Sequence, residues 1–399
     1  MAPTAPARLY ESTHPWITFH ADLNRLSHRT WLLLGESQSK CSHIAGAPLT
    51  PAVAAQLHLL YLSKGIHGTT SIEGNTLSED EVRQRIDGDL DLPRSREYLG
   101  TEIDNVLALC NVVIEDVVKG RDAGLTVERI HEFNERILDG LPLKPDVIPG
   151  KTRAHSVTVG ISSYRGAPAE DCDYLLEKMV DWLNSMQAPE DQPEMRFPLA
   201  VIKSILAHLY IAWIHPFGDG NGRTARMIEF QLMIEAGAPS PASHLLSNHY
   251  NLTRDAYLVE LDRTSRLPGF PTEGFIQYAL QGLVDQLREQ IERIKAHQYE
   301  VTWQNYVHEV FHDEDTPAKR RQRHLVLDMP KGEIVPRSKI RDVSSRIIQE
   351  YGDAGEKTLT RDLNVLVARK LLVKTKSGFR ANREVIAAFL PVKKDIDLT

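Results

Sequence analysis

Apolar residues recur every three or four positions along several stretches of the chain, which is the spacing of amphipathic helices. Residues 51–71 show this spacing at Leu57 and Tyr61, and Thr50-Pro51 in front of them is a typical helix start. The same spacing predicts further helices over residues 95–119, 172–186, 199–214 and 272–310. These segments predict a mainly α fold.

Two places depart from the helical spacing. Residues 155–161 are short and β-branched and run into a turn at 164–166, which predicts a small β-hairpin. Near the C-terminus, short helices are expected at 341–350 and 359–372, followed by two strands around a Lys-Ser-Gly turn. That helix-plus-hairpin pattern resembles winged-helix domains.

Charge is distributed unevenly along the 399 residues. From residue 319 onward there are 19 Lys and Arg against 10 Asp and Glu, whereas the preceding residues hold 28 basic and 44 acidic side chains. Such a split indicates domains with different partners. We expect an N-terminal helical region (1–95), a central core (96–285), a helical connector (286–318) and a winged-helix domain (319–399).

Composition narrows the class of protein. The chain is 42% hydrophobic and 25% charged, as globular proteins are, and no apolar run that could cross a membrane stands out. The N-terminus lacks the apolar core of a secretory signal, and the three cysteines show no disulfide or metal spacing. We therefore expect a cytoplasmic protein without a membrane partner.

The segment with the most evident chemistry is HPFGDGNGRTAR, residues 215–226, between two apolar helical stretches. Its glycines permit close approach to a ligand, and the loop opens onto a helix N-terminus, which favours an anion. Arg223 and Arg226 lie on one face of the first turn and suit phosphate oxygens. Asp219 is a hard oxygen ligand for Mg²⁺, and His215 has the chemistry of a general base. Together they predict phosphate chemistry on a nucleotide.

The same segment resembles the Fic-family signature H-P-F-x-[DE]-G-N-G-R-x-x-R at every specified position. The resemblance implies a Fic helical core with a small β-hairpin flap, in which AMP passes from ATP to a Ser, Thr or Tyr hydroxyl of a target protein. It makes His215 the base, Asp219 the Mg²⁺ ligand and Phe217 the anchor of the loop. It assigns ATP phosphate binding to Gly220, Asn221, Gly222, Arg223 and Arg226.

A second match lies upstream. The run TTSIEG, residues 69–74, fits the family's inhibitory pattern [ST]-x-x-x-E-[GN] at the end of a predicted helix. A carboxylate at a helix C-terminus is unfavourable unless a cation pairs with it. The resemblance implies that Glu73 pairs with Arg226, takes the place of the ATP γ-phosphate and inhibits the enzyme.

Three further parts of the chain fit the family less closely. Residues 151–164 stand where the family has the flap that holds the target, and Arg153, Ser156 and Val157 are its candidate contacts. Tyr257 resembles a tyrosine that borders the adenosine pocket in the family, although Thr253 stands where the family has Asn. A role of Tyr257 in core packing is an equally good interpretation. His208, His244 and His249 are expected to be core or loop residues.

Alternatives remain open from the residues alone. The same site could remove AMP from a modified protein, and UMP, phosphocholine or phosphate are moved by a few relatives. A different class of function is DNA binding through the basic C-terminal domain. The target protein could be the enzyme itself, and the resemblance implies a homodimer.

Overall fold

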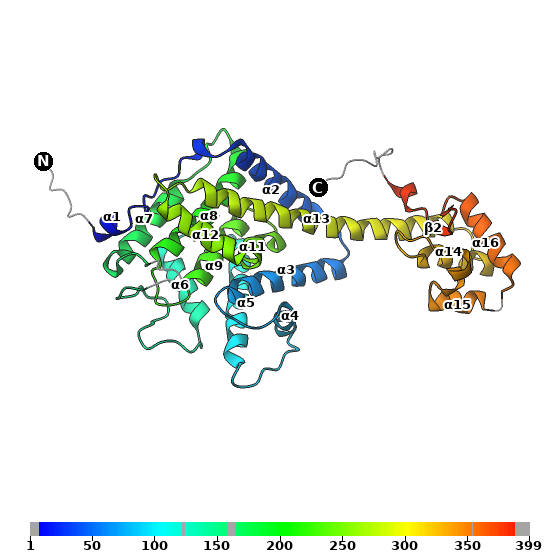
Figure 1. The fold of residues 1–399 in the computed structure, drawn as a ribbon, viewed down its shortest axis with the longest axis horizontal. Coiled ribbons are helices and arrows are strands. Elements are labelled where there is room, and N and C mark those ends of the chain that lie inside the picture. The colour runs from blue at the N-terminus through cyan, green and yellow to red at the C-terminus, as the bar shows by residue number, and fades with distance from the viewer. Residues whose placement is uncertain (1–7, 122–123, 158–164, 353, 388–399) are drawn as a thin grey trace. The chain divides into compact units, whose positions relative to one another are not determined.

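In the computed structural model the described residues are 8–121, 124–157, 165–352 and 354–387. They form two compact units, Met1–Glu292 and Arg293–Thr399, each with its own hydrophobic core. The chain is mainly helical, as predicted, and its one assigned sheet is a two-stranded pair among the described residues of the second unit. Figure 1 shows both units; the finer division into four parts stays a prediction.

The first unit is built around two helices, α8 (Arg196–Ile214) and α9 (Asn221–Glu235), which pack against each other. Helix α9 also packs on three helices from earlier in the chain. These are α3 (Pro51–Ser71), α5 (Glu97–Val118) and α6 (Val127–Leu138). The turn between α8 and α9 is therefore surrounded by segments from distant parts of the sequence.

Other helices complete the first unit around this pair. They are α1 (Leu9–Thr13), α2 (His28–Gly46), α4 (Glu79–Asp87), α7 (Cys172–Ser185), α10 (Ser240–Ser243), α11 (Leu245–Leu252), α12 (Arg254–Arg266) and the part of the long α13 (Glu273–Val310) that ends at Glu292. Short 3₁₀ turns lie at Leu23–Arg25, Ala169–Asp171 and Pro193–Met195.

One stretch among the described residues, Pro193–Ile214, has the length and composition of a membrane-spanning helix, with a mean hydropathy of 1.7. The sequence reading overlooked it. Of its most apolar 18-residue window, however, 83% is buried, and most residues of α8 are buried. A central helix that is surrounded on all sides must be apolar all round, so packing accounts for this composition.

The predicted helices agree with the structure where their apolar spacing is strongest. Helix α3 has the bounds expected, and the stretch 272–310 is one continuous helix, α13. Helices α2 and α6 were not predicted. Of the predicted hairpin, residues 158–164 lie outside the described residues; beside that gap, the Gly166 N–H donates to the Val157 carbonyl at 3.2 Å.

The second unit contains α14 (Pro317–Asp328), a 3₁₀ turn (Arg337–Asp342), α15 (Ser345–Tyr351) and α16 (Glu356–Ala368). Strands β1 (Leu372–Lys374) and β2 (Phe379–Ala381) pair antiparallel, with Leu372 opposite Ala381. The expected helix 359–372 was wrong at its end. It stops at Ala368 because Lys370 takes a left-handed conformation, with φ 61°, and turns the chain into β1.

The expected linker at 313–317 is the break between α13 and α14, and it lies inside the second unit. Pro317 begins α14, and the Thr316 side chain accepts from the Lys319 N–H, which makes this a capped helix start. The basic run from Lys319 is therefore part of a helix that contributes Leu325 and Val326 to the second core.

Candidate active site

The loop between α8 and α9 is held in one shape by its own side chains. His215 caps α8 in a left-handed conformation, with φ 51° and ψ 57°, which is rare for a residue other than glycine. The Asn221 side chain accepts from the Phe217 N–H at 2.9 Å and donates to the Phe217 carbonyl at 2.8 Å. Phe217 is buried in the core, which agrees with its expected role as an anchor. The left-handed backbone of His215 is strained, and backbone strain of this kind is typical of functional sites.

Arg153 holds the same loop from the side. It is buried, and its guanidinium donates to the main-chain carbonyls of His215 at 2.8 Å, His155 at 2.7 Å and Ala167. Its own N–H donates to the Pro216 carbonyl at 2.9 Å. Arg153 therefore positions the His215 loop from inside the fold. Of the other flap candidates, Ser156 is exposed and Val157 half-buried.

The environment of His215 keeps its ring neutral. Burial, helped by the positive charge of Arg153, lowers the pKa of His215 to about 4, although the carboxylates of Glu73 and Asp219 favour the protonated ring. A neutral imidazole can accept a proton at physiological pH. The polyphosphate of ATP would add negative charge beside the ring and so favour proton uptake once the substrate is bound.

The first turn of α9 forms an anion site. The first N–H groups of a helix have no partner within the helix, and its dipole favours negative charge there. Gly220, which precedes α9, has φ 76°. A Cβ on it would lie 2.9 Å from the Asn134 side chain, so Asn134 packs closely against the backbone at this glycine. Nη1 of Arg226 and Nε of Arg223 are buried without a hydrogen-bond partner in the described part of the chain. Phosphate oxygens suit such donors.

Glu73 reaches this anion site from the turn that follows α3. Its Oε1 accepts from Nη2 of Arg226 at 2.6 Å, and a Cβ on Gly222 would lie 2.0 Å from the same oxygen. Arg226 also donates to the hydroxyl and the carbonyl of Thr69, at 2.7 and 2.9 Å. Partial burial raises the pKa of Glu73, but Arg226 more than offsets it, so the pKa is lowered overall and the side chain is ionised.

Asp219 fits the expected metal ligand in its chemistry. Its side chain is 49% exposed, and Oδ1 accepts from Nη2 of Arg223 at 3.0 Å. Among the residues that the structure describes, no group of three or more His, Cys, Asp or Glu could hold a metal ion by itself. One carboxylate beside a phosphate site is nevertheless what Mg²⁺ commonly uses, because substrate phosphates and water complete its shell.

Tyr257 lies in the core of the first unit. Its side chain is buried, and its hydroxyl is 2.8 Å from Nε2 of His208. His208 is also within 3.0 Å of Glu229, which accepts from the Tyr250 hydroxyl at 2.8 Å. These four residues form a polar cluster inside the core. The place of Tyr257 beside an adenosine pocket stays a prediction. His244 is likewise buried, as expected.

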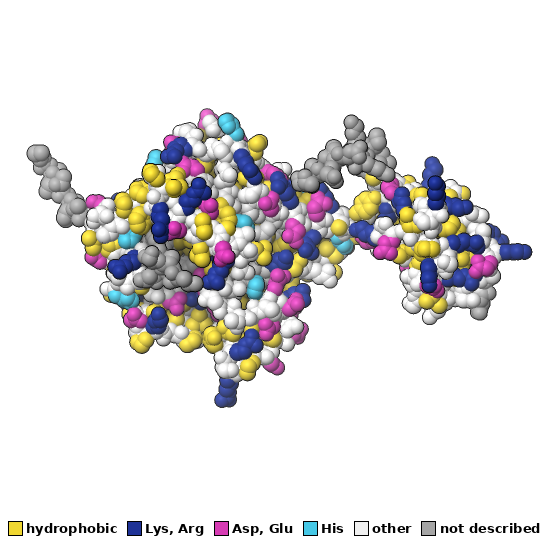
Figure 2. Space-filling model, viewed as in Figure 1, with side chains coloured by type: hydrophobic (Ala, Val, Ile, Leu, Met, Phe, Trp, Pro, Cys, Tyr) yellow, Lys and Arg dark blue, Asp and Glu magenta, His cyan; other side chains and the backbone are white. Residues whose placement is uncertain are grey.

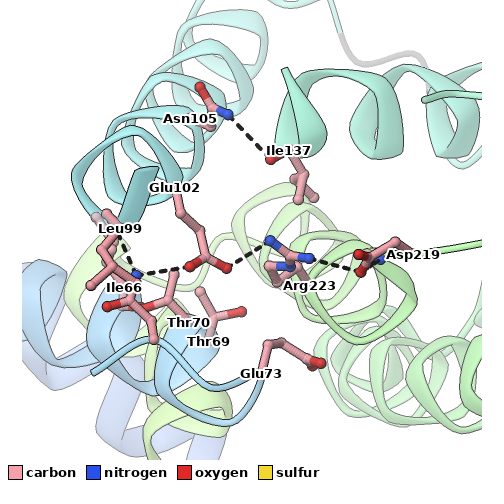
Figure 3. A network of polar contacts seen from close by, with 12 residues as sticks. Ile66, Thr69, Thr70, Glu73, Leu99, Glu102, Asn105, Ile137, Asp219 and Arg223 are labelled. Carbon is pink, nitrogen blue, oxygen red and sulfur yellow. Dashed lines mark hydrogen bonds and ion pairs between the residues drawn. The ribbon is translucent and has the colours of Figure 1, made fainter. Parts of the chain in front are cut away.

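Sequence reasoning missed two buried residues of the site, Glu102 and Asn75. Glu102 accepts from Nη1 of Arg223 at 2.6 Å, and Figure 3 shows the two side chains facing each other, with Asp219 beyond the guanidinium. Asn75 donates to Glu102 at 2.8 Å. The only signal in the sequence was a glutamate among the apolar residues of the 95–119 helix, and nothing there indicated its partner.

The lowered pKa of His215 leads to a prediction on pH dependence. Transfer activity of a Glu73→Gly variant, as kcat/KM for ATP, is expected to stay nearly level from about pH 8 to 5.5, because a base with a pKa of about 4 stays neutral. A histidine at the ordinary 6.5 would be only about one tenth neutral at pH 5.5. Removing the Glu73 charge lowers the pKa further. A tenfold fall with a midpoint near 6.5 would contradict the prediction.

Comparison with known proteins agrees with this geometry. Residues 124–233 match the Fic/DOC family. The chain is 26% identical over 205 residues to "Protein adenylyltransferase fic-1" of Caenorhabditis briggsae, covering 51% of this chain and 37% of that protein. It is 31% identical over 180 residues to "Protein adenylyltransferase Fic" of Drosophila willistoni, covering 45% and 32%. The matched region thus spans well under half the length of these relatives.

Solved structures show the same fold. A Fic family protein from Desulfovibrio desulfuricans matches with a TM-score of 0.55 at 19% identity, over 89% of this chain and 96% of that one. Fic-1 from C. elegans matches with a TM-score of 0.51 at 20% identity, over 67% and 73%. With the signature loop intact and the helical core in place, residues 124–233 match the Fic domain of the Fic/DOC family in sequence and in fold.

Proposed function

We propose that this protein is a protein adenylyltransferase, which transfers AMP from ATP to a Ser, Thr or Tyr hydroxyl of a target protein. The observation that carries the proposal is the loop at 215–220, which sets a neutral His215 next to the N-terminus of α9 and its two arginines. The adenylyltransferase names of the relatives support the same reaction.

In the proposed reaction the target oxygen attacks the α-phosphorus of ATP in line with the leaving group. A phosphorus–oxygen bond forms to the target, the bond from the α-phosphorus to the bridging oxygen breaks, and pyrophosphate leaves. The hydroxyl proton moves to the ring of His215. The N–H groups of the first turn of α9 and the guanidinium of Arg223 would stabilise the charge on the phosphates.

Asp219 would hold Mg²⁺ together with ATP phosphates, and the ion would neutralise charge that builds up on the departing pyrophosphate. The exposure of the Asp219 side chain and its ion pair with Arg223 support this role.

Inhibition by Glu73 is part of the proposal. Its carboxylate pairs with Arg226 and stands against Gly222, where the terminal phosphate of ATP would compete for the same guanidinium. ATP that binds with Glu73 in place would meet a like charge and be displaced from the productive position. The resting protein is therefore expected to transfer slowly.

Radiolabelled nucleotides test the reaction. Glu73→Gly is incubated with lysate proteins and ATP labelled at either the α- or the γ-phosphorus, and with α-labelled UTP. Label on protein from α-labelled ATP alone supports AMP transfer. Label from γ-labelled ATP means phosphate transfer instead, and label from UTP means UMP transfer. If the wild type only releases AMP from a labelled target, removal is its main reaction.

Binding of duplex DNA by the second unit is a second candidate function, which one feature favours. A groove of about 270 Å³ lies between α16 and the β1–β2 turn, lined in part by Arg337, Asn364, Lys374 and Lys376 without a carboxylate. The exposed face of α16 adds Lys357 and Arg361, and Figure 2 shows Lys and Arg side chains over the visible face of this unit. A helix beside a basic hairpin suits a phosphate backbone.

Fluorescence anisotropy with labelled duplex DNA checks this candidate. The full chain is expected to bind with an affinity that falls as salt rises, and Lys374→Ala/Lys376→Ala is expected to weaken binding about tenfold and to flatten the salt slope by about two. Lys331→Ala, an exposed residue of the same unit outside the groove, serves as control. No binding at about 50 mM salt would refute it.

A further inference from the structure

Glu102 is a carboxylate buried between two parts of the active site. It lies on α5 and is 7% exposed. One of its oxygens accepts from Nη1 of Arg223, at 2.6 Å, and the other accepts from Nδ2 of Asn75, at 2.8 Å. An isolated buried carboxylate is costly, so both oxygens need their donors.

Burial raises the pKa of Glu102, while the charge of Arg223 and the hydrogen bond from Asn75 act in the opposite direction. The two donors belong to different segments, since Arg223 lies on α9 and Asn75 follows α3. One carboxylate therefore joins the phosphate-binding loop to the segment that carries Glu73 (Figure 3).

Asn75 fastens the turn behind Glu73 to α5. It is 7% exposed, and Nδ2 donates to the Leu99 carbonyl at 3.0 Å as well as to Glu102. Its Oδ1 accepts from the Leu77 N–H at 3.0 Å, and its own N–H donates to the Thr70 carbonyl at 3.1 Å. These bonds close the turn that carries Glu73, whose carboxylate contacts Arg226.

We propose that Glu102 is a positioning residue with two tasks: it orients Arg223 toward the phosphates, and through Asn75 it keeps the Glu73 turn seated on α5. The proposal rests on the proposed adenylyl transfer and deepens it, because it ties the strength of inhibition to the carboxylate that aims a phosphate-binding arginine. Glu73 then has a support that does not involve its own contact with Arg226.

The two tasks are separable by substitution. Asn75→Ala removes the donor on the Glu73 side and leaves the charged pair of Glu102 with Arg223 intact. Glu102→Gln removes the charge, and its amide group would point a donor at either Arg223 or Asn75, so at least one contact is lost. Each variant is made with Glu73 present and in the Glu73→Gly background.

With Glu73 present, Asn75→Ala is expected to raise AMP transfer about tenfold, the effect of losing a hydrogen bond to a charged group. In the Glu73→Gly background this gain is expected to disappear, because no inhibitory carboxylate remains to be held. Glu102→Gln in that background is expected to lower kcat about tenfold with a smaller change in KM for ATP.

Asn105→Ala is the matched control. Asn105 lies on the same helix and donates to the carbonyls of Ile137 and Asp139, at 3.2 and 2.7 Å, but it does not touch Glu102 or Arg223. It loses two hydrogen bonds of a half-buried amide on the same helix, so its melting temperature shows the cost of losing such bonds away from Glu102. Its transfer is expected to match that of its parent in both backgrounds.

Hydrogen exchange separates failure of this inference from failure of the proposed reaction. Amides at residues 72–77 are expected to exchange about tenfold faster in Asn75→Ala than in Asn105→Ala, whether or not the protein transfers AMP. Unchanged exchange of the amides at residues 72–77 would overturn the proposal that Asn75 holds the Glu73 turn on α5. Equal effects of Asn75→Ala on transfer in both Glu73 backgrounds would also overturn it, as would Glu102→Gln with a normal kcat.

Discussion

Glu73→Gly is expected to raise AMP transfer by about 100-fold over the wild type, the largest gain that any single substitution in this chain should give. The carboxylate of Glu73 holds Nη2 of Arg226 at 2.6 Å and lies against Gly222, so it competes with a phosphate for both. Its removal frees a buried guanidinium whose Nη1 already has no hydrogen-bond partner among the described residues.

Initial rates of label transfer from α-labelled ATP measure the effect, with ATP affinity measured in parallel. Glu73→Gln, which keeps the size and loses the charge, is expected to fall between the wild type and Glu73→Gly. Asp80, an exposed carboxylate of α4, forms a surface ion pair with Arg83. Asp80→Ala is the control and should behave as the wild type. Equal rates for Glu73→Gly and the wild type would remove Glu73 as an inhibitor.

His215→Ala in the Glu73→Gly background is expected to lower transfer by about 10³-fold, within the range for loss of a general base. The backbone at 215 is left-handed, so alanine adds strain there, but Arg153 and Asn221 hold the loop through main-chain atoms that alanine retains. ATP should therefore still bind with an affinity within a few-fold of the parent, and the loss should appear in kcat.

Single-turnover label transfer and equilibrium ATP binding together check this result. His312→Ala, with a side chain 82% exposed in the second unit, is the matched histidine control and should leave both unchanged. A His215→Ala variant that transfers AMP at more than about a tenth of the parental rate would show that another group takes the proton.

The sequence was informative where chemistry is local. The loop at 215–226 carries its whole pattern within twelve residues, and its helices were expected because α8 is apolar and α9 follows glycines. The contact of Glu73 with Arg226 joins residues 153 positions apart, and only the family resemblance pointed to it. The structure then brought the two together as expected.

Other parts of the site could not be read from local patterns. Arg153 was named only as a candidate contact of the flap, whereas its guanidinium donates to the carbonyls of His215 and Ala167 beside the signature loop. Asn75 gave no signal, and Glu102 showed only as a glutamate among apolar residues, because a buried ion pair becomes visible only when α3, α5 and α9 pack. Helices α6 and α14 were missed since their many charged residues hide a short apolar stripe.

The side chain of Asn221 has a consequence for how quickly and how tightly a nucleotide can settle. Both the oxygen and the nitrogen of its amide group form hydrogen bonds with the main chain of Phe217, so the loop has its final shape before any ligand binds. Ordering a flexible loop would consume part of the binding energy, and here that conformational entropy was given up during folding. The loop between α8 and α9 is therefore rigid before a nucleotide binds.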